Sequence, residues 1–152
     1  MNFGHICRRL ALLSGVLVVA GCATAAPKAG ASADEPIKVV YHISENSEQA
    51  ANALRNARNH LTADPTVKIT MVTHSGGIDF LLDGAKDKGG ALFEPTVQEL
   101  VKRGVDFRVC KITLDRRNID PKRVIEEGKL VPSGMAEVAR LQAREGYVYA
   151  KP

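Results

Sequence analysis

The sequence has few aromatic residues and almost no excess charge. Aromatic side chains make up 5% of its 152 residues, and tryptophan is absent. Proteins that hold single-stranded nucleic acid stack the bases on aromatic side chains, so this composition argues against that class. The net charge is +4, and setting aside Arg8 and Arg9, which lie in the leader segment described next, leaves 19 basic against 17 acidic residues. Such a weak charge predicts no nucleic-acid partner and no electrostatic attraction to a membrane surface.

The N-terminal apolar run is too short to span a bilayer. It extends over residues 10–20, whereas a transmembrane helix needs about 20 apolar residues. Arg8 and Arg9 precede the run and small residues follow it, which is typical of a secretory signal peptide. The sequence Val19-Ala20-Gly21-Cys22 is similar to a bacterial lipobox, in which the cysteine is lipidated and cleavage occurs just before it. Residues 1–22 are therefore predicted to be a signal peptide with a lipobox, and Cys22 to carry the lipid anchor.

Two other interpretations of the N-terminus stay open. Cleavage after Ala23-Thr24-Ala25 also fits the small-x-small rule and would release a soluble periplasmic protein, and the remaining alternative is no export. Residues 23–35 are rich in Ala, Ser, Gly and Lys, which predicts a flexible tether. We therefore expect an exported, periplasmic protein, anchored in a membrane through its lipid, whose folded domain spans residues 36–152.

The sequence has three cysteines, and their positions leave one free thiol. Cys7 lies in the segment predicted to be removed, and Cys22 is predicted to be lipidated. Cys110 then has no partner for an intramolecular disulfide. An unpaired cysteine in an exported protein suggests a reactive thiol or an intermolecular partner.

Short β-branched runs alternate with amphipathic stretches from Pro36 onward. Strands are predicted at 37–43, 67–73, 105–110, 129–131 and 147–149. Helices are predicted from a cap at Asn46, with Gln49 as its partner in a capping box, and at 78–82, 95–103, 112–117 and 134–145. Strands and helices in regular alternation imply crossover connections, so the sequence predicts an α/β domain with a mostly parallel sheet covered on both faces.

Several residues capable of chemistry follow the predicted strands directly. His42, His74 and Cys110 lie at the ends of the first three strands, and Ser133-Gly134 follows the fourth. Ligands of open parallel sheets bind outside the carboxyl ends of the strands, so these residues are predicted to share one edge. The two histidines are candidate acid–base groups, metal ligands or neutral packing residues. Together with Cys110 they could hold Cu or Zn, although no CxxC or HxxxH spacing is present.

Cys110 is the candidate nucleophile. Side chains alternate along a strand, which places Arg108 on the same face as Cys110, and Lys111 is adjacent in sequence. Nearby cations and the start of the following helix favour the thiolate, which is the reactive form. The alternative is that Cys110 is a small buried apolar residue.

Two glycine-containing segments are candidate anion sites. Ser75-Gly76-Gly77 precedes a short helix and could cradle an anion, with a tight turn as the alternative. Ser133 fits a helix cap better than a nucleophile, because it lacks a nucleophile elbow, and with Gly134 it forms the second candidate. No cofactor motif and no dedicated metal motif is present, so neither a cofactor nor a metal site is predicted.

The segment 38–152 resembles the DsrE/DsrF-like sulfur-relay family, in particular its exported single-domain members. The residues that carry the resemblance are VVYH (39–42), LRN (54–56), NHL (59–61), VTH (72–74), GIDFLL (77–82), GVDFRVC (104–110), VPSG (131–134) and GYVY (146–149). The resemblance implies a three-layer α/β/α sandwich with a five-stranded parallel sheet, assembled as a trimer or hexamer. In sulfur-relay members a cysteine carries sulfur as a persulfide, and Cys110 is the residue that fits this role.

The leading hypothesis is a thiol-based sulfur carrier or sulfurtransferase-like protein that forms a persulfide on Cys110. Arg108 would stabilise the anion, and His42 or His74 would shuttle a proton. The expected partners are a sulfur donor or acceptor protein or a small sulfur species. One alternative is a non-catalytic periplasmic module that binds a soft metal or a small anion at the same edge, and another is a purely structural assembly protein.

Overall fold

The structure is a computed structural model, and it describes residues 35–152. The predicted signal peptide, the lipobox with Cys22 and the tether up to residue 34 lie outside the described residues. Within 35–152, no helix is both long enough and apolar enough to cross a membrane.

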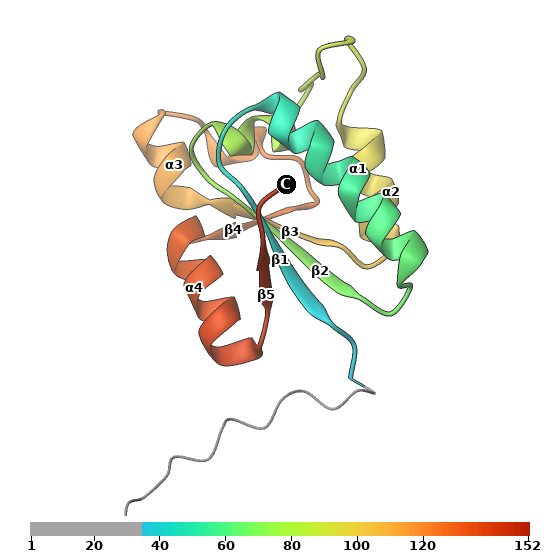
Figure 1. Ribbon diagram of the computed structural model, residues 1–152. Helices are drawn as coiled ribbons and strands as arrows, with labels where there is room; N and C mark the ends of the chain where they lie inside the picture. Colours follow the sequence, from blue (N-terminus) through green and yellow to red (C-terminus); the bar gives the residue numbers. More distant parts are fainter. Residues whose placement is uncertain (1–34) are drawn as a thin grey trace, which may run out of the picture. The chain divides into compact units, whose positions relative to one another are not determined.

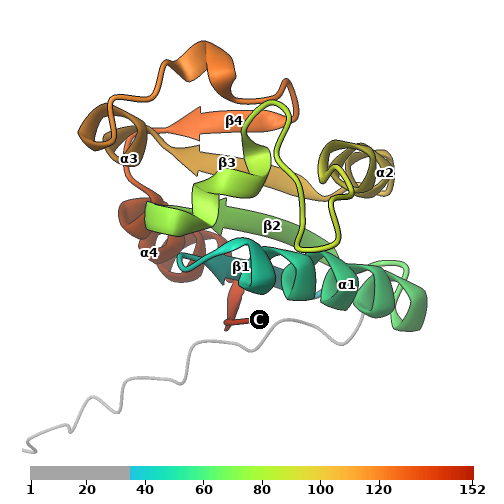
Figure 2. The same cartoon turned by 90° about the horizontal axis from the view of Figure 1, so that it is seen from above.

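A five-stranded sheet forms the centre of the domain (Figure 1). Its strands are β1 (Lys38–Ile43), β2 (Lys68–Thr73), β3 (Asp106–Cys110), β4 (Gly128–Val131) and β5 (Val148–Ala150). Every strand pair is parallel, and the order across the sheet is β4-β3-β2-β1-β5. Figure 2 shows β4, β3, β2 and β1 side by side in this order. The carboxyl ends of all strands therefore lie along one edge.

Helices cover both faces of the sheet. They are α1 (Ser47–Ala63), α2 (Glu94–Lys102), α3 (Lys111–Arg116) and α4 (Gly134–Glu145), with two 3₁₀ helices, η1 (Ser75–Leu81) and η2 (Pro121–Arg123). In Figure 1, α1 and α2 lie on one side of the sheet and α4 on the other, where α4 contacts β1, β2 and β3. This confirms the three-layer α/β/α class.

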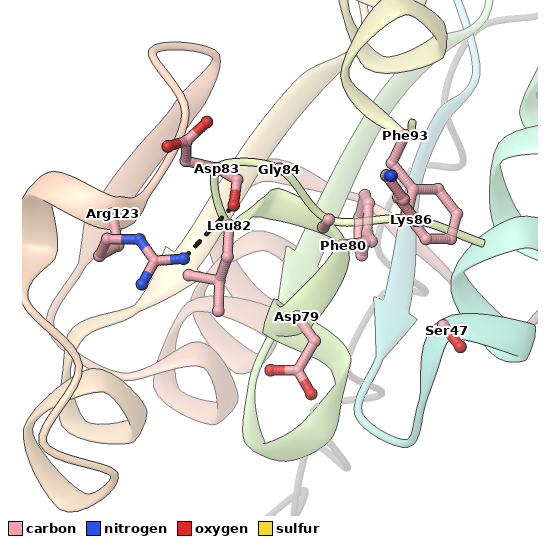
Figure 3. A pocket seen from close by; sticks show the side chains of 10 residues that line it. Ser47, Asp79, Phe80, Leu82, Asp83, Gly84, Lys86, Phe93 and Arg123 are labelled. Atoms are coloured by element: carbon pink, nitrogen blue, oxygen red, sulfur yellow. Dashed lines mark hydrogen bonds between the residues drawn. The ribbon is translucent and has the colours of Figure 1, made fainter. Parts of the chain in front are cut away.

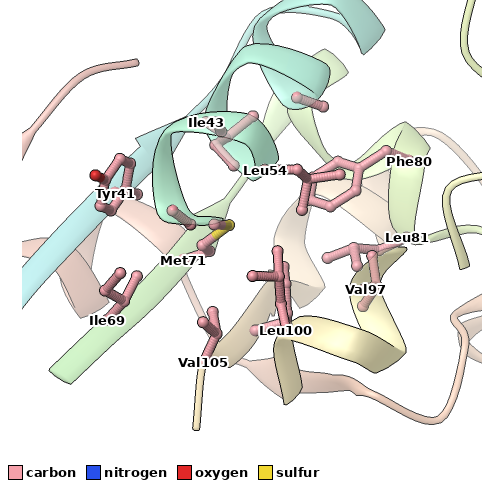
Figure 4. Packing of buried hydrophobic residues seen from close by; sticks show 14 of the residues in the cluster. Tyr41, Ile43, Leu54, Ile69, Met71, Phe80, Leu81, Val97, Leu100 and Val105 are labelled. Atoms are coloured by element: carbon pink, nitrogen blue, oxygen red, sulfur yellow. The ribbon is translucent and has the colours of Figure 1, made fainter. Parts of the chain in front are cut away.

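The larger part of the hydrophobic core lies between the sheet and the layer that contains α1, α2 and η1 (Figure 4). Its largest fully buried side chains include Ile43, Met71, Phe80, Leu100 and Phe107. The core under α4 is smaller and consists of Val40, Val72, Val138 and Leu141. Both faces of the central strands are apolar, which is the pattern of a parallel sheet buried on both sides.

The start of α1 differs from a capping box in one detail. The Asn46 side chain accepts hydrogen bonds from the backbone N–H groups of Glu48 and Gln49, as a cap should. The Gln49 side chain does not bond to the cap residue, because its Oε1 accepts from the N–H groups of Ser44 and Glu45 instead. The Gln49 side chain therefore holds Ser44 and Glu45, the two residues that follow β1, in the loop between β1 and α1.

Other differences from the expected elements are small. The short helix after β2 is a 3₁₀ helix that begins at Ser75, three residues before the expected start. The turn at Pro121 contains a 3₁₀ turn of its own. Ala50, Leu54, Ala57 and Leu61 form a buried stripe along α1, at the spacing of an amphipathic helix. Gly146 ends α4 with a φ of 74°. A left-handed residue after a helix is the conformation that glycine adopts most easily.

Candidate functional site

The carboxyl ends of β1, β2 and β3 bring the two histidines and the cysteine to one edge of the sheet. His42 is the penultimate residue of β1, His74 follows β2, and Cys110 is the last residue of β3. Gly134, the first residue of α4, lies between two of them. A Cβ atom placed on Gly134 would be 3.1 Å from the His74 Cβ and 3.3 Å from the Cys110 Cβ. His74 and Cys110 therefore flank the same point of the backbone.

His42 and His74 form a directly bonded pair. Their Nε2 atoms are 2.7 Å apart, which requires one proton between them. The other ring nitrogens are also bonded: His42 Nδ1 lies 2.8 Å from the Tyr149 hydroxyl and His74 Nδ1 lies 2.9 Å from Ser75 Oγ. The four side chains form one chain of hydrogen bonds from β5 to η1.

The environment of this pair keeps both rings neutral. Burial lowers the pKa of His42 below its ordinary value, and the charges of His74 and Lys151 lower it further. Burial also lowers the pKa of His74. Each neutral imidazole therefore has one nitrogen lone pair at neutral pH, which can accept a proton or bind a metal when its hydrogen bond opens.

Cys110 is a buried residue that precedes the first turn of α3 and lies beside Gly134 at the start of α4. Burial alone would raise the pKa of its thiol, but hydrogen bonding from the Thr113 hydroxyl and from the N–H groups of Gly134, Thr113 and Ile112 outweighs burial and lowers the pKa. Donors from the first turns of both α3 and α4 thus favour the thiolate. The side chain is 5% exposed, so only a small part of the sulfur is open to a reactant.

Thr113 links the cysteine to the segment that carries His74. Its Oγ1 accepts a hydrogen bond from the Ser75 N–H at 3.0 Å, which leaves its own proton for the sulfur. Ser75 has a φ of 52°, an uncommon conformation for a residue with a side chain. Arg117 holds this turn, because its Nη1 donates to the Ser75 carbonyl at 3.1 Å and to Asp79 at 2.6 Å.

The guanidinium of Arg108 is bonded to two carboxylates. Arg108 lies on the same face of β3 as Cys110, but its guanidinium donates to Asp106 at 2.7 Å and to Glu137. Burial would lower the pKa of Arg108, and its bonds to Asp106 and Glu137 raise it instead. Lys111 is likewise bonded to Asp115. Neutral donors therefore favour the thiolate, and cationic side chains do not.

The Ser75-Gly76-Gly77 segment packs against the protein and leaves little room for an anion. The N–H of Ser75 donates to Thr113 and the N–H of Gly77 donates to the His74 carbonyl. A Cβ on Gly76 would lie 1.9 Å from the Glu45 carbonyl oxygen, and one on Gly77 would lie 2.3 Å from that of Ile43. The two glycines therefore allow a close approach to the end of β1 and the loop that follows it, as a tight turn requires.

Ser133 and Gly134 have separate roles. Ser133 Oγ accepts from the Ala136 N–H at 3.4 Å and caps α4, as the sequence indicates. Gly134 lies beside Cys110, and its N–H is among the groups that lower the pKa of the Cys110 thiol.

A separate hollow of about 360 Å³ lies near η1, the loop after it and η2 (Figure 3). Its wall contains no histidine and no cysteine. The lining residues are Ser47, Asp79, Phe80, Leu82, Asp83, Gly84, Ala85, Lys86, Phe93 and Arg123. Figure 3 shows the Arg123 guanidinium bonded to the Asp83 carbonyl, which fixes this wall from η2. The hollow is therefore distinct from the edge that carries His42, His74 and Cys110.

Two residues of the site were not expected from the sequence. Tyr149 lies in the last strand, and only the pairing of β5 with β1 brings it to His42. The sequence did contain a signal for Thr113 as a neighbour of the cysteine. Thr113 lies three residues after Cys110, the last residue of a strand, and in the first turn of the next helix. Its neighbour in space, Ser75, is 38 positions away in the chain.

The chain belongs to the DsrE/DsrF-like family, which it matches over residues 37–149. One similar solved structure is a protein of unknown function from Methanobacterium thermoautotrophicum, with 29% identity, a TM-score of 0.67, and coverage of 76% of this chain and 99% of that one. Another is the ychN protein from E. coli, with 19% identity, a TM-score of 0.64 and the same coverage. No curated protein matches the chain. These likenesses agree with the α/β fold.

Proposed function

We propose that the protein is a thiol-based sulfur carrier in which the Cys110 thiolate accepts a sulfur atom and becomes a persulfide. The observation that carries this proposal is the position of Cys110, which is the N-cap residue of α3 and lies beside Gly134, the first residue of α4. Polar hydrogens at these two helix starts lower the pKa of its thiol. Such donors stabilise an anion at the sulfur without any neighbouring cation. Membership of the DsrE/DsrF-like family supports the same chemistry.

The transfer step needs no added oxidant. With thiosulfate as donor, the Cys110 thiolate attacks the outer sulfur, a new S–S bond forms, and the old S–S bond breaks. The bonding electron pair leaves with sulfite, so one thiolate and one thiosulfate give one persulfide anion and one sulfite. With a low-molecular-weight persulfide as donor, the thiolate attacks its outer sulfur and the leaving group is the corresponding thiolate. Transfer to an acceptor thiolate is the same step in reverse.

The small exposed fraction of Cys110 restricts the reactants. At 5% exposure, the sulfur can be reached by a small sulfur species or by a sulfur atom that projects from a partner protein. The His42–His74 pair supplies a proton acceptor and donor on the same edge. The pair would take up the proton of a protonated donor or return one to a leaving thiolate.

The test is an intact-mass measurement on a chain in which Cys110 is the sole cysteine. Cys7→Ser and Cys22→Ser remove the other two thiols, so any adduct must form on Cys110. Incubation with thiosulfate, polysulfide or a persulfide should add the mass of one sulfur atom, and a reductant should remove it. The matched control adds Cys110→Ser and should gain no mass. An adduct of equal yield on this control, or no adduct on the single-cysteine chain, would exclude the proposal.

The assembly and the location of the protein are part of the same proposal. Ile112, Leu130 and Met135 are 48%, 44% and 54% exposed and come from α3, β4 and α4, which supports burial of this apolar surface in a homo-oligomer. Light scattering should then give a trimer or hexamer, and a monomeric mass would contradict it.

We also propose export and lipidation at Cys22, for which Cys22→Ala should release the protein from the membrane fraction.

A further inference from the structure

The His42–His74 pair joins one buried imidazole, that of His42, to one partly exposed imidazole, that of His74. Each ring directs Nε2 at the other, at 2.7 Å, while each Nδ1 is bonded to a hydroxyl oxygen. The rings are tilted by 38° with centroids 4.8 Å apart, so they meet at their nitrogen atoms and are not stacked. Two lone-pair positions therefore converge on one point, which a single proton occupies in the hydrogen-bonded pair.

We propose that His42 and His74 form a two-coordinate site for a soft monovalent cation, Cu⁺ or Ag⁺, which takes the place of the proton between the two Nε2 atoms. The number of ligands selects this class of ion. Within residues 35–152, no group of three or more His, Cys, Asp or Glu side chains is placed to hold a metal. Zn²⁺ prefers four ligands, whereas a d¹⁰ monovalent ion is satisfied by two nitrogen ligands in a line.

The hydroxyl groups behind the rings fit this role. A histidine that binds a metal usually donates its other ring N–H to an oxygen atom, which fixes the tautomer and the ring orientation. Tyr149 and Ser75 already provide such an oxygen at each Nδ1. Tyr149 comes from β5 and Ser75 from η1, so two separate elements hold the two rings in place.

The exchange conserves protons. When the cation binds, the proton between the rings moves to Nδ1 of the ring that carried it. The hydroxyl that had donated to that nitrogen then turns and accepts. Both Nδ1 atoms now donate, both Nε2 atoms bind the cation, and no proton leaves the site. The cation keeps its charge, so the step needs neither an oxidant nor a reductant.

The geometry requires a small movement. Metal–imidazole bonds are about 2 Å long, so the two Nε2 atoms must separate from 2.7 Å to about 4 Å. His42 is fixed within β1 and 8% exposed, whereas His74 lies after the end of β2 and is partly exposed. His74 is therefore the ring that moves. Lys151 is the cation whose charge acts on His42, and it is paired with Glu45 at 2.7 Å, which offsets its repulsion of a bound ion.

The test uses the full chain with Cys7, Cys22 and Cys110 replaced by serine, so that no thiol can bind the ion. Ag⁺, added in a halide-free buffer, is the probe, and native mass spectrometry and calorimetry give stoichiometry and affinity. We expect one Ag⁺ per chain and an affinity at least tenfold weaker with His74→Gln. His60→Gln is the matched control, because His60 is bonded to Tyr41 and lies outside the pair, and it should leave the affinity unchanged.

A second measurement does not depend on any histidine variant. In the thiol-free chain labelled with ¹⁵N in its histidines, Ag⁺ should shift the two Nε2 resonances together and leave both Nδ1 atoms protonated. Binding that His74→Gln does not weaken, or a shift of one Nε2 resonance alone, would overturn the proposal, as would a chain that binds no Ag⁺. Because this chain lacks Cys110, the outcome is independent of the persulfide test.

Discussion

Replacing Thr113 with valine tests whether hydrogen-bond donors, and not a neighbouring cation, make the Cys110 thiol reactive. Valine has nearly the shape of threonine but lacks the hydroxyl that donates to the sulfur. A hydrogen bond to a charged group contributes about 1.5–3 kcal/mol, and we take the lower end because sulfur is a weak acceptor. That loss raises the pKa of the Cys110 thiol and lowers its thiolate fraction about tenfold at any pH well below that pKa.

Thr113→Val should also lower the stability of the domain, because the Thr113 hydroxyl accepts a hydrogen bond. The Ser75 N–H loses its acceptor, Thr113 Oγ1, and Ser75 is an exposed residue whose N–H can bond to water instead. The free energy of unfolding in urea should therefore fall by the net worth of one hydrogen bond, about 0.5–1.5 kcal/mol. Thr113→Ser keeps the hydroxyl and should preserve most of both properties.

The assay is the rate of alkylation by iodoacetamide as a function of pH, measured on the single-cysteine chain. The rate follows the thiolate fraction, so the Thr113→Val profile should be displaced to higher pH and the Thr113→Ser profile should stay close to that of the parent. Fluorescence or circular dichroism at each pH verifies that both variants are folded. If the Thr113→Val profile superimposed on that of the parent, the donors would not control the thiol and the reasoning would fail.

Three further predictions address the turn, the ion pair and the histidines. Gly76→Ala should lower the free energy of unfolding by about 3 kcal/mol or more, because its Cβ would lie 1.9 Å from a carbonyl oxygen, while Gly89→Ala should change it by less than about 0.5 kcal/mol in the same denaturation experiment. Arg108→Met should cost about 1–3 kcal/mol in stability yet leave the pH profile of alkylation unchanged, and a displaced profile would restore Arg108 to the thiolate site. Burial lowers the pKa of His42 and His74 in the folded state, so the unfolded chain binds more protons near pH 6.5, and the stability present above that pH should decline as the pH falls through and below it. His74→Gln should flatten this decline in urea titrations between pH 7.5 and 5.

The sequence indicated most of the elements because their signals are local. The β-branched run at 37–43 and the stripe that contains Leu54 and Leu61 each bury one face, and the structure has a strand and a helix there. The position of His42, His74 and Cys110 at one edge also followed from the sequence, since parallel strands place their carboxyl ends together. Family membership, with its three-layer fold, was recognised from residues spread over the whole domain.

The partners of each side chain were decided by tertiary structure. Alternation along β3 correctly placed Arg108 on the face of Cys110, but it gave no information on Glu137, which lies 29 positions away and takes the guanidinium. The groups that lower the pKa of the Cys110 thiol come from α3 and α4, which β4 separates in the chain, so only the folded sheet brings them together.

What the sequence determined by itself was the kind of residue at each strand end and the edge on which those residues lie. What only the folded chain decided was which nitrogen faces which oxygen. Tyr149 reaches His42 because β5 pairs with β1, and Gly134 lies beside both His74 and Cys110 because glycine permits that approach. Such contacts depend on distances of a few ångströms between segments far apart in the chain, and periodicity and propensity carry no information at that scale.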